Sequence, residues 1–293
     1  MLPDFVIVGA ARSGTTSLYR YCAEHPEIFM SGVKETNFFS SNPFEFTRAT
    51  YERLFETANG ACAVGEASPS YLYDAVAPAA IKQAIPECRI VIILRDPGER
   101  LISDFYYSQG WGSNLDVDFT TFLTACIERE GAGRQGFVPA LMAEKGMYAE
   151  QVQRYLDVFS ERRMFIRLFD DLQENPRKVV AELYEFLGVD SSFEPELEQV
   201  HNANSEPVFP LLSRLIKRAG RLETLLVDPL VPSTMKGRVT NLMLDLNRRR
   251  RGKESVRRSI TPEDRARLAQ LYHVQTHALE RLIDRDLSHW LRC

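Results

Sequence analysis

The stretch Phe5-Val6-Ile7-Val8-Gly9-Ala10-Ala11-Arg12-Ser13-Gly14-Thr15-Thr16-Ser17-Leu18 joins an apolar, β-branched run to the start of an amphipathic segment. The apolar run predicts a buried strand that ends at Gly9, and the hydroxyl residues Thr15, Thr16 and Ser17 predict the first turn of a helix. Small residues between the two let backbone N–H groups point at an anion, and the helix N-terminus adds partial positive charge. The stretch therefore predicts a strand, a phosphate-binding loop and a helix.

The loop resembles a Walker A motif but differs from it at a decisive position. Gly9 and Gly14 have the required separation, whereas Thr15 stands where nucleotide-triphosphate enzymes need a lysine. A cation is present instead at Arg12, whose planar guanidinium can hold a terminal phosphate. The simpler alternative is a helix cap that carries a surface arginine. The missing lysine weakens the interpretation as an ordinary kinase or ATPase.

Composition sets limits on the class of protein. The 293 residues are 44% hydrophobic, enough for a large core, and the net charge of −4 argues against nucleic acid as a partner. No leader and no apolar run of membrane-spanning length is visible, so we expect no membrane span. The five cysteines are scattered without the spacing of a zinc or redox site, which favours reduced thiols and a cytoplasmic location: Cys22, Cys62, Cys88, Cys126 and Cys293.

Strand and helix patterns alternate over the first 200 residues, which predicts a mainly parallel, doubly wound α/β sheet. After the first strand, apolar runs predict strands over Cys62–Glu66, Arg89–Leu94 and Met164–Phe169. Amphipathic periodicity predicts helices over Arg48–Thr57, around Ile81–Ile85, from Pro97 onward, and over Asp118–Glu130, Tyr148–Phe159 and Pro176–Leu187.

From about His201 the pattern changes, with no convincing strand. Helices are expected near 211–226, 235–249 and 262–290, and the arginine run Arg248–Arg251 is expected to be a solvated surface between two of them. The sequence thus predicts one domain over 1–293, with an α/β core over 1–200 and a helical extension over 201–293.

Two further polar groups follow predicted strands or short apolar segments. One is the pair Lys34-Glu35, and the other is Arg95-Asp96-Pro97, with Ser103 further along the same predicted helix. Together with the first loop they resemble the sulfotransferase superfamily, which transfers a sulfuryl group from 3′-phosphoadenosine-5′-phosphosulfate (PAPS). The resemblance extends through Gly65–Tyr71, the expected turn Asp170-Asp171-Leu172, Asn175-Pro176 and Phe186–Val189.

The resemblance implies a role for each group. The first loop would hold the 5′-phosphosulfate through Arg12, Ser13, Gly14, Thr15, Thr16 and Ser17. Arg95 and Ser103 would hold the 3′-phosphate, and the product would be 3′-phosphoadenosine-5′-phosphate (PAP). The pattern from Lys34-Glu35 to Phe39 is similar to the heparan-sulfate-type branch and its bacterial relatives. In that branch the glutamate, here Glu35, is the general base.

Lys34 or Arg12 would then offset the charge that gathers on the departing phosphate, and no metal is needed. The same branch implies a third cation on the donor from a loop before the final helix, where Arg257 and Arg258 stand.

The sequence departs from the family pattern at two positions, and it leaves several functions open. Arg12 stands where many family members have lysine, and Ala67 stands where heparan enzymes often have a cation, which argues against a polyanionic glycan. The acceptor is expected to be a hydroxyl of a sugar, glycan or natural product, with O- versus N-sulfation and oligomeric state open. The competing functions are an ATP-dependent P-loop small-molecule kinase and a non-catalytic nucleotide-binding protein. Lys34-Glu35 alone also fits an ordinary surface pair.

Overall fold

The computed structural model describes residues 1–41, 46–110, 117–128, 139–197, 205–207, 248–250 and 260–292. The chain divides into two compact units, each assembled from separate stretches of sequence. The first contains Met1–Arg100, Ala143–His201 and Ala266–Cys293, and the second contains Leu101–Met142 and Asn202–Arg265. The expected division into a core over 1–200 and an extension over 201–293 stays a prediction.

The first unit is built on a five-stranded sheet in which every paired strand is parallel. The strands are β1 (Phe5–Gly9), β2 (Ile28–Met30), β3 (Ala63–Ala67), β4 (Arg89–Leu94) and β5 (Met164–Leu168), in the order β2-β3-β1-β4-β5. The parallel α/β prediction is confirmed. Strand β2 was not predicted, because three residues are too few to show a hydrophobic period.

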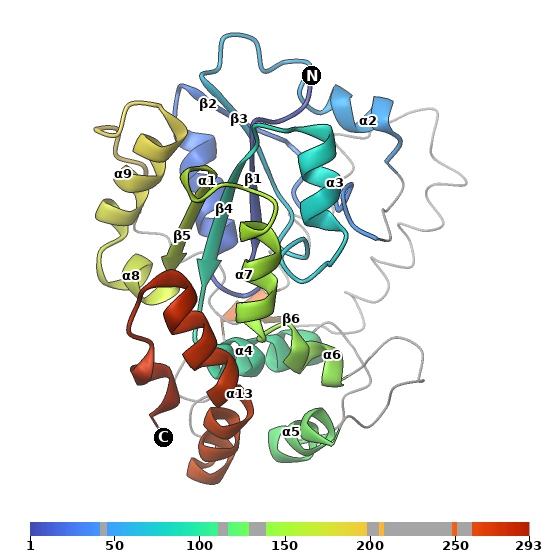
Figure 1. Ribbon diagram of the computed structural model, residues 1–293, viewed down its shortest axis with the longest axis vertical. Coiled ribbons are helices and arrows are strands. Elements are labelled where there is room, and N and C mark those ends of the chain that lie inside the picture. Colours follow the sequence, from blue (N-terminus) through green and yellow to red (C-terminus); the bar gives the residue numbers. More distant parts are fainter. Residues whose placement is uncertain are drawn as a thin grey trace. The chain divides into compact units, whose positions relative to one another are not determined.

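Helices connect these strands or follow the last of them (Figure 1). They are α1 (Thr15–Glu24), α2 (Arg48–Arg53), α3 (Ala77–Ala84), α7 (Tyr148–Leu156), α8 (Phe169–Glu174) and α9 (Pro176–Leu187), with short 3-10 turns at Glu161–Arg163 and Ser288–Leu291. Helix α4 (Pro97–Gly110) begins in the first unit and continues in the second, and α13 (Pro262–Ile283) runs from the second into the first.

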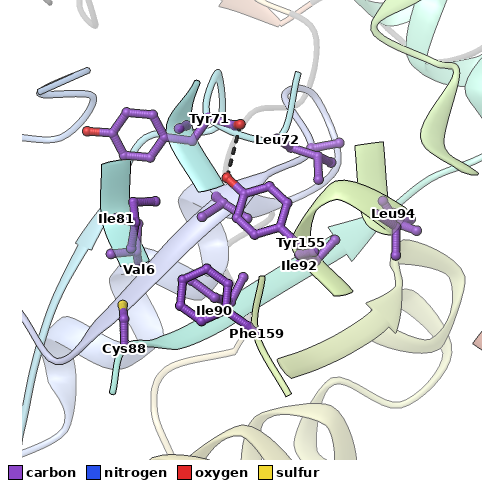
Figure 2. Packing of buried hydrophobic residues seen from close by; sticks show 14 of the residues in the cluster. Val6, Tyr71, Leu72, Ile81, Cys88, Ile90, Ile92, Leu94, Tyr155 and Phe159 are labelled. Atoms are coloured by element: carbon purple, nitrogen blue, oxygen red, sulfur yellow. Dashed lines mark hydrogen bonds between the residues drawn. The ribbon is translucent and has the colours of Figure 1, made fainter. Parts of the chain in front are cut away.

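Alternate residues of the central strands face two separate cores, which makes the sheet doubly wound. Val6 and Ile90 belong to a cluster that also takes in side chains of α2, α3, α7 and α13. Phe5 and Val91 belong to the other cluster, with α1 and α9. Figure 2 shows part of the first cluster, in which the Tyr155 hydroxyl reaches the Tyr71 carbonyl. Burial on both faces explains why these strands are continuous apolar runs in the sequence.

The second unit contains α5 (Phe119–Ile127), α6 (Pro139–Glu144, whose end reaches into the first unit) and two short strands. Strand β6 (Ser205–Pro207) pairs antiparallel with β7 (Arg248–Arg250). The expectation of no strand after about His201, and of a helix reaching Arg249, was therefore wrong. Backbone pairing between segments some 40 residues apart leaves no local signal in a run of arginines. The expected helix near 211–226 lies outside the described residues.

The C-terminal region of the first unit corrects two local expectations. The expected turn Asp170-Asp171-Leu172 lies within α8, where the Asp171 carboxylate accepts a hydrogen bond from the Leu168 N–H at 3.2 Å. Helix α13 ends at Ile283 instead of continuing to 290, because Asp284 adopts a left-handed backbone with φ of 50°. Asp171 then binds the guanidinium of Arg285 at 2.9 Å. The Asp171–Arg285 pair therefore joins the start of α8 to the segment that follows α13.

Candidate active site at the carboxyl ends of the strands

The loop between β1 and α1 has the geometry of an anion cradle. The Ala10 N–H donates to the Ile93 carbonyl at 2.7 Å, and the Ser13 N–H donates back to the Ala10 carbonyl at 3.2 Å. Gly14 caps α1 in the left-handed region at φ 93°, and a Cβ there would lie 2.9 Å from Cδ2 of Phe169. Backbone conformation and crowding both require glycine at this position.

The loop offers donors that a phosphate would satisfy. The N–H groups of Thr15 and Thr16 come before the first intrahelical hydrogen bonds, which Ser17 and Leu18 donate to the Gly14 carbonyl, and they point out of the helix N-terminus. Ser13 is fully buried, and its Oγ has no hydrogen-bond partner among the described residues. The buried Tyr148 hydroxyl is in the same situation. Burial raises the pKa of Tyr148 to about 12, and the charge of Arg100 together with the Ser13 hydroxyl opposes that rise. Free backbone N–H groups at a helix N-terminus fit a phosphate group.

Arg95 follows β4 directly and lies against the loop. Its Nη1 donates to the Arg12 carbonyl at 3.3 Å, its Nη2 lies 3.5 Å from Oε2 of Glu99, and its guanidinium stacks over the Phe169 ring at 5.2 Å. Burial lowers the pKa of Arg95, with Glu99 opposing that effect, and an arginine in this setting stays charged. The loop and Arg95 are therefore one contiguous group.

The next residues place charge at the start of α4. Asp96 Oδ1 accepts the N–H groups of Gly98 at 2.7 Å and Glu99 at 3.1 Å. Burial nevertheless raises the pKa of Asp96 to about 6. Arg100, one turn further along, is fully buried.

Ser103 is also buried on α4, but it belongs to the second unit, so its pairing with Arg95 at one phosphate stays a prediction. Arg257 and Arg258 lie outside the described residues.

Lys34 and Glu35 stand after β2, at the same edge of the sheet as the loop and Arg95. Lys34 Nζ binds Oε1 of Glu35 at 2.6 Å, and the Glu35 side chain is 57% exposed. The Glu35 N–H donates to the Ala67 carbonyl at the end of β3 at 2.9 Å, while the Ser68 N–H donates to Ile7 of β1 at 3.1 Å. The carboxyl ends of parallel strands meet at one edge, where α/β proteins bind ligands. The first loop, the pair Lys34-Glu35 and Arg95 therefore all stand at this edge of the sheet.

Sequence reasoning missed two residues of this region. Phe169 packs beside both Gly14 and Arg95, and Tyr148 lies beside Ser13 and Arg100. A signal existed for Phe169, since it follows β5 directly and must fall at the ligand-binding edge. Tyr148 begins a helix elsewhere in the sequence, and only the packing of α7 brings it near the loop.

This combination of a parallel sheet, a glycine-capped loop and an adjoining arginine is typical of α/β proteins that bind nucleotide phosphates. Residues 2–207 match the model of the sulfotransferase domain, and the chain belongs to that family. Among the described residues there is no cluster of histidine, cysteine and acidic side chains able to hold a metal ion. Within the same part of the chain, no helix is long and apolar enough to cross a membrane.

Individual relatives show how far the similarity reaches. A sulfotransferase from Alicyclobacillus acidocaldarius is 28% identical, with a TM-score of 0.70 and all of both chains covered. The bifunctional heparan sulfate N-deacetylase/N-sulfotransferase 4 of Mus musculus is 27% identical over 201 residues, which are 64% of this chain but 22% of that protein. The chain thus spans about a fifth of that relative. Mouse sulfotransferase SULT7A1, solved with PAP, shares the fold at 12% identity and a TM-score of 0.52, with 96% of this chain and 88% of that one covered.

Proposed function

We propose that this protein transfers a sulfuryl group from PAPS to a hydroxyl of a sugar, glycan or natural-product acceptor, with Glu35 as the general base. One observation carries the proposal: an anion cradle and an arginine in mutual contact stand at the sheet edge that also holds Lys34-Glu35. Family membership supports the reaction class. The PAP-bound mouse sulfotransferase supports the donor, and the heparan sulfate relative supports a sugar acceptor.

Most of the proposed site residues bind the donor PAPS. The loop from Arg12 to Ser17 holds the 5′-phosphosulfate through N–H groups, hydroxyls and the Arg12 guanidinium. Arg95 and Ser103 hold the 3′-phosphate, and Arg257 or Arg258 adds a third contact. The protein needs no metal in this scheme, because charged side chains offset the developing charge.

Glu35 accepts the proton of the acceptor hydroxyl as its oxygen forms a bond to sulfur. The bond between sulfur and the 5′-phosphate oxygen breaks at the same time, and PAP leaves with the electron pair. Lys34 or Arg12 offsets the charge that this oxygen acquires. The ion pair of Lys34 with Glu35, at 2.6 Å, supports this division of roles, because it puts a cation directly beside the carboxylate.

Transfer of labelled sulfate from PAPS tests the proposal. The protein is incubated with PAPS and a panel of neutral sugars, glucosamine-containing oligosaccharides and phenolic natural products, and products are identified by the mass of one added sulfuryl group. Amino sugars with and without a blocked amine separate N- from O-transfer.

Parallel reactions with ATP test the kinase alternative, which Thr15 in place of the lysine disfavours. Binding of PAP without transfer to any acceptor would favour a non-catalytic nucleotide-binding protein. Phosphoryl transfer from ATP would replace the proposal.

A further inference from the structure

A buried carboxylate lies directly beneath the segment that carries Glu35. Glu66 on β3 is fully buried. Its Oε2 accepts hydrogen bonds from the Thr36 hydroxyl at 2.8 Å and the Ser68 hydroxyl at 3.0 Å, and its Oε1 accepts one from the Tyr51 hydroxyl at 3.1 Å. No cationic side chain in the described part of the chain forms an ion pair with it. We call Glu66 with these three hydroxyls the Glu66 hub.

The backbone of segment 35–39 is hydrogen-bonded at alternate residues to the end of β3 and to the residues that follow this strand. The Glu35 N–H donates to the Ala67 carbonyl at 2.9 Å, the Asn37 N–H to the Ser68 hydroxyl at 3.2 Å, and the Phe39 N–H to the Tyr71 hydroxyl at 3.1 Å. Thr36 adds its side-chain bond to Glu66. Two of the hub's hydroxyl residues, Thr36 and Ser68, therefore also hold this segment.

The backbone of the segment needs such support. Glu35 has φ of 63° and Asn37 has φ of 51°, both in the left-handed region that residues with a Cβ rarely occupy. Each such residue costs about 1–3 kcal/mol and persists only where the surrounding contacts over-determine it. Without the bonds to β3 and the hub, the segment would relax toward ordinary backbone angles, and the Glu35 carboxylate would move.

Tyr71 is itself fixed by a residue of the hydrophobic core, Tyr155. Figure 2 shows its carbonyl accepting the Tyr155 hydroxyl, at 3.0 Å, while its own ring hydroxyl points away from that contact. The Tyr71 hydroxyl also lies 3.3 Å from the Thr36 hydroxyl. The hub and the segment thus rest on side chains that the hydrophobic core immobilises.

We propose that Glu66 is a positioning residue for the general base: through Thr36 and Ser68 it fixes the backbone of 35–37 and so the direction in which Glu35 presents its carboxylate. This inference rests on the proposed function of Glu35. The two carboxylate oxygens have different donors, because Oε2 accepts from Thr36 and Ser68 whereas Oε1 accepts from Tyr51 of α2.

The test compares one substitution on each side of the carboxylate. Thr36→Val removes the hydroxyl that ties the segment to Oε2 and keeps the side-chain shape. Tyr51→Phe, the matched control, removes the hydroxyl that donates to Oε1 and keeps the ring that packs against Phe38 and Phe39 of the segment. Each variant loses a buried hydrogen bond to Glu66, and Thr36→Val also loses the contacts of its hydroxyl with the Tyr71 hydroxyl at 3.3 Å and the Phe38 N–H at 3.5 Å. Thr36→Val is therefore expected to lower the urea midpoint at least as far as Tyr51→Phe. Hydrogen exchange of a peptide spanning 33–39 measures the protection of the segment's backbone N–H groups directly and requires no sulfuryl acceptor.

The expected results differ between the two variants. Thr36→Val speeds exchange of the segment by about tenfold, the equivalent of one hydrogen bond, and lowers kcat of sulfuryl transfer by about 10- to 100-fold, the effect of a displaced catalytic group. The dissociation constant for PAP stays within about twofold, since the donor loop is unchanged. Tyr51→Phe changes neither segment exchange nor kcat by more than about twofold.

A double variant separates this inference from the assignment of Glu35. In a Glu35→Gln background, adding Thr36→Val is expected to cost little further activity, because both changes act through the same carboxylate. Equal loss of kcat in Thr36→Val and Tyr51→Phe, or unchanged segment exchange in Thr36→Val, would overturn the positioning role while leaving Glu35 as base. Normal turnover of Glu35→Gln would overturn the base assignment itself, and the catalytic meaning of the hub with it.

Discussion

Replacing Arg95 with alanine gives a prediction whose size follows from the contacts of this side chain. Two losses are expected. The first is the charge-assisted bond to the 3′-phosphate, worth about 1.5–3 kcal/mol, which corresponds to about 10- to 150-fold in affinity. The second is the bond from Nη1 to the Arg12 carbonyl. At 3.3 Å this bond is long, and it contributes about 0.5–1.5 kcal/mol to the order of the loop, or about 2- to 10-fold in affinity.

The two losses fall on different ligands. Loosening of the loop weakens PAP and adenosine 5′-phosphate alike, because both carry the 5′-phosphate that the loop holds. Loss of the 3′-phosphate contact weakens PAP alone. The ratio of the two dissociation constants is therefore expected to fall by about 10- to 150-fold in Arg95→Ala.

Calorimetric titration of both nucleotides at one fixed salt concentration measures that ratio, since phosphate contacts depend on ionic strength. Arg163→Ala is the matched control. This arginine pairs with Glu87 and precedes β5, at the opposite end of the strand from the candidate site. It is expected to leave both affinities unchanged.

Urea unfolding of each variant verifies that the loss of the Phe169 stacking contact has not unfolded the protein. Equal weakening of both nucleotides by Arg95→Ala would refute the reasoning, because it would assign Arg95 to the loop alone.

Three further predictions concern the base, the loop and the cap of α4. Glu35→Gln is expected to lower kcat by about 10²- to 10⁴-fold with PAP affinity unchanged, and full activity would exclude this residue as the base. Gly14→Ala, at φ 93° and with its Cβ 2.9 Å from the Phe169 ring, is expected to cost about 1–3 kcal/mol in urea unfolding, and an unchanged midpoint would contradict the crowding. Burial raises the pKa of Asp96 to about 6, above the ordinary value near 4, so the folded state keeps the proton of this carboxyl to a higher pH than the unfolded state does. Stability should therefore fall as pH rises from about 4 to about 6, and Asp96→Asn should flatten that fall; parallel curves for both proteins would count against it.

Sequence patterns were sufficient for four of the five strands of the parallel sheet and for the longer helices that accompany them. The expected strand over Arg89–Leu94 and helix over Pro176–Leu187 coincide with β4 and α9. Both are long enough to show a continuous apolar run or a helical period. The sulfotransferase family was identified from the loop, Lys34-Glu35 and the residues after β4, because these positions at strand ends carry chemistry that packing alone does not demand.

Only the tertiary structure decided which side chains meet. Composition gave no reason to expect a strand at Arg248–Arg250, since its partner Ser205–Pro207 is distant in sequence. Phe169 reaches Gly14 and Arg95 only because β5 lies next to β4. In the sequence Glu66 is only one polar residue within an apolar strand. It contacts Thr36, next to Glu35, because β3 pairs with β2. The hydrophobic pattern of a strand indicates which face of the sheet a residue occupies. The neighbours of that residue on the face depend on the order of the strands, and a short stretch of sequence does not contain that order.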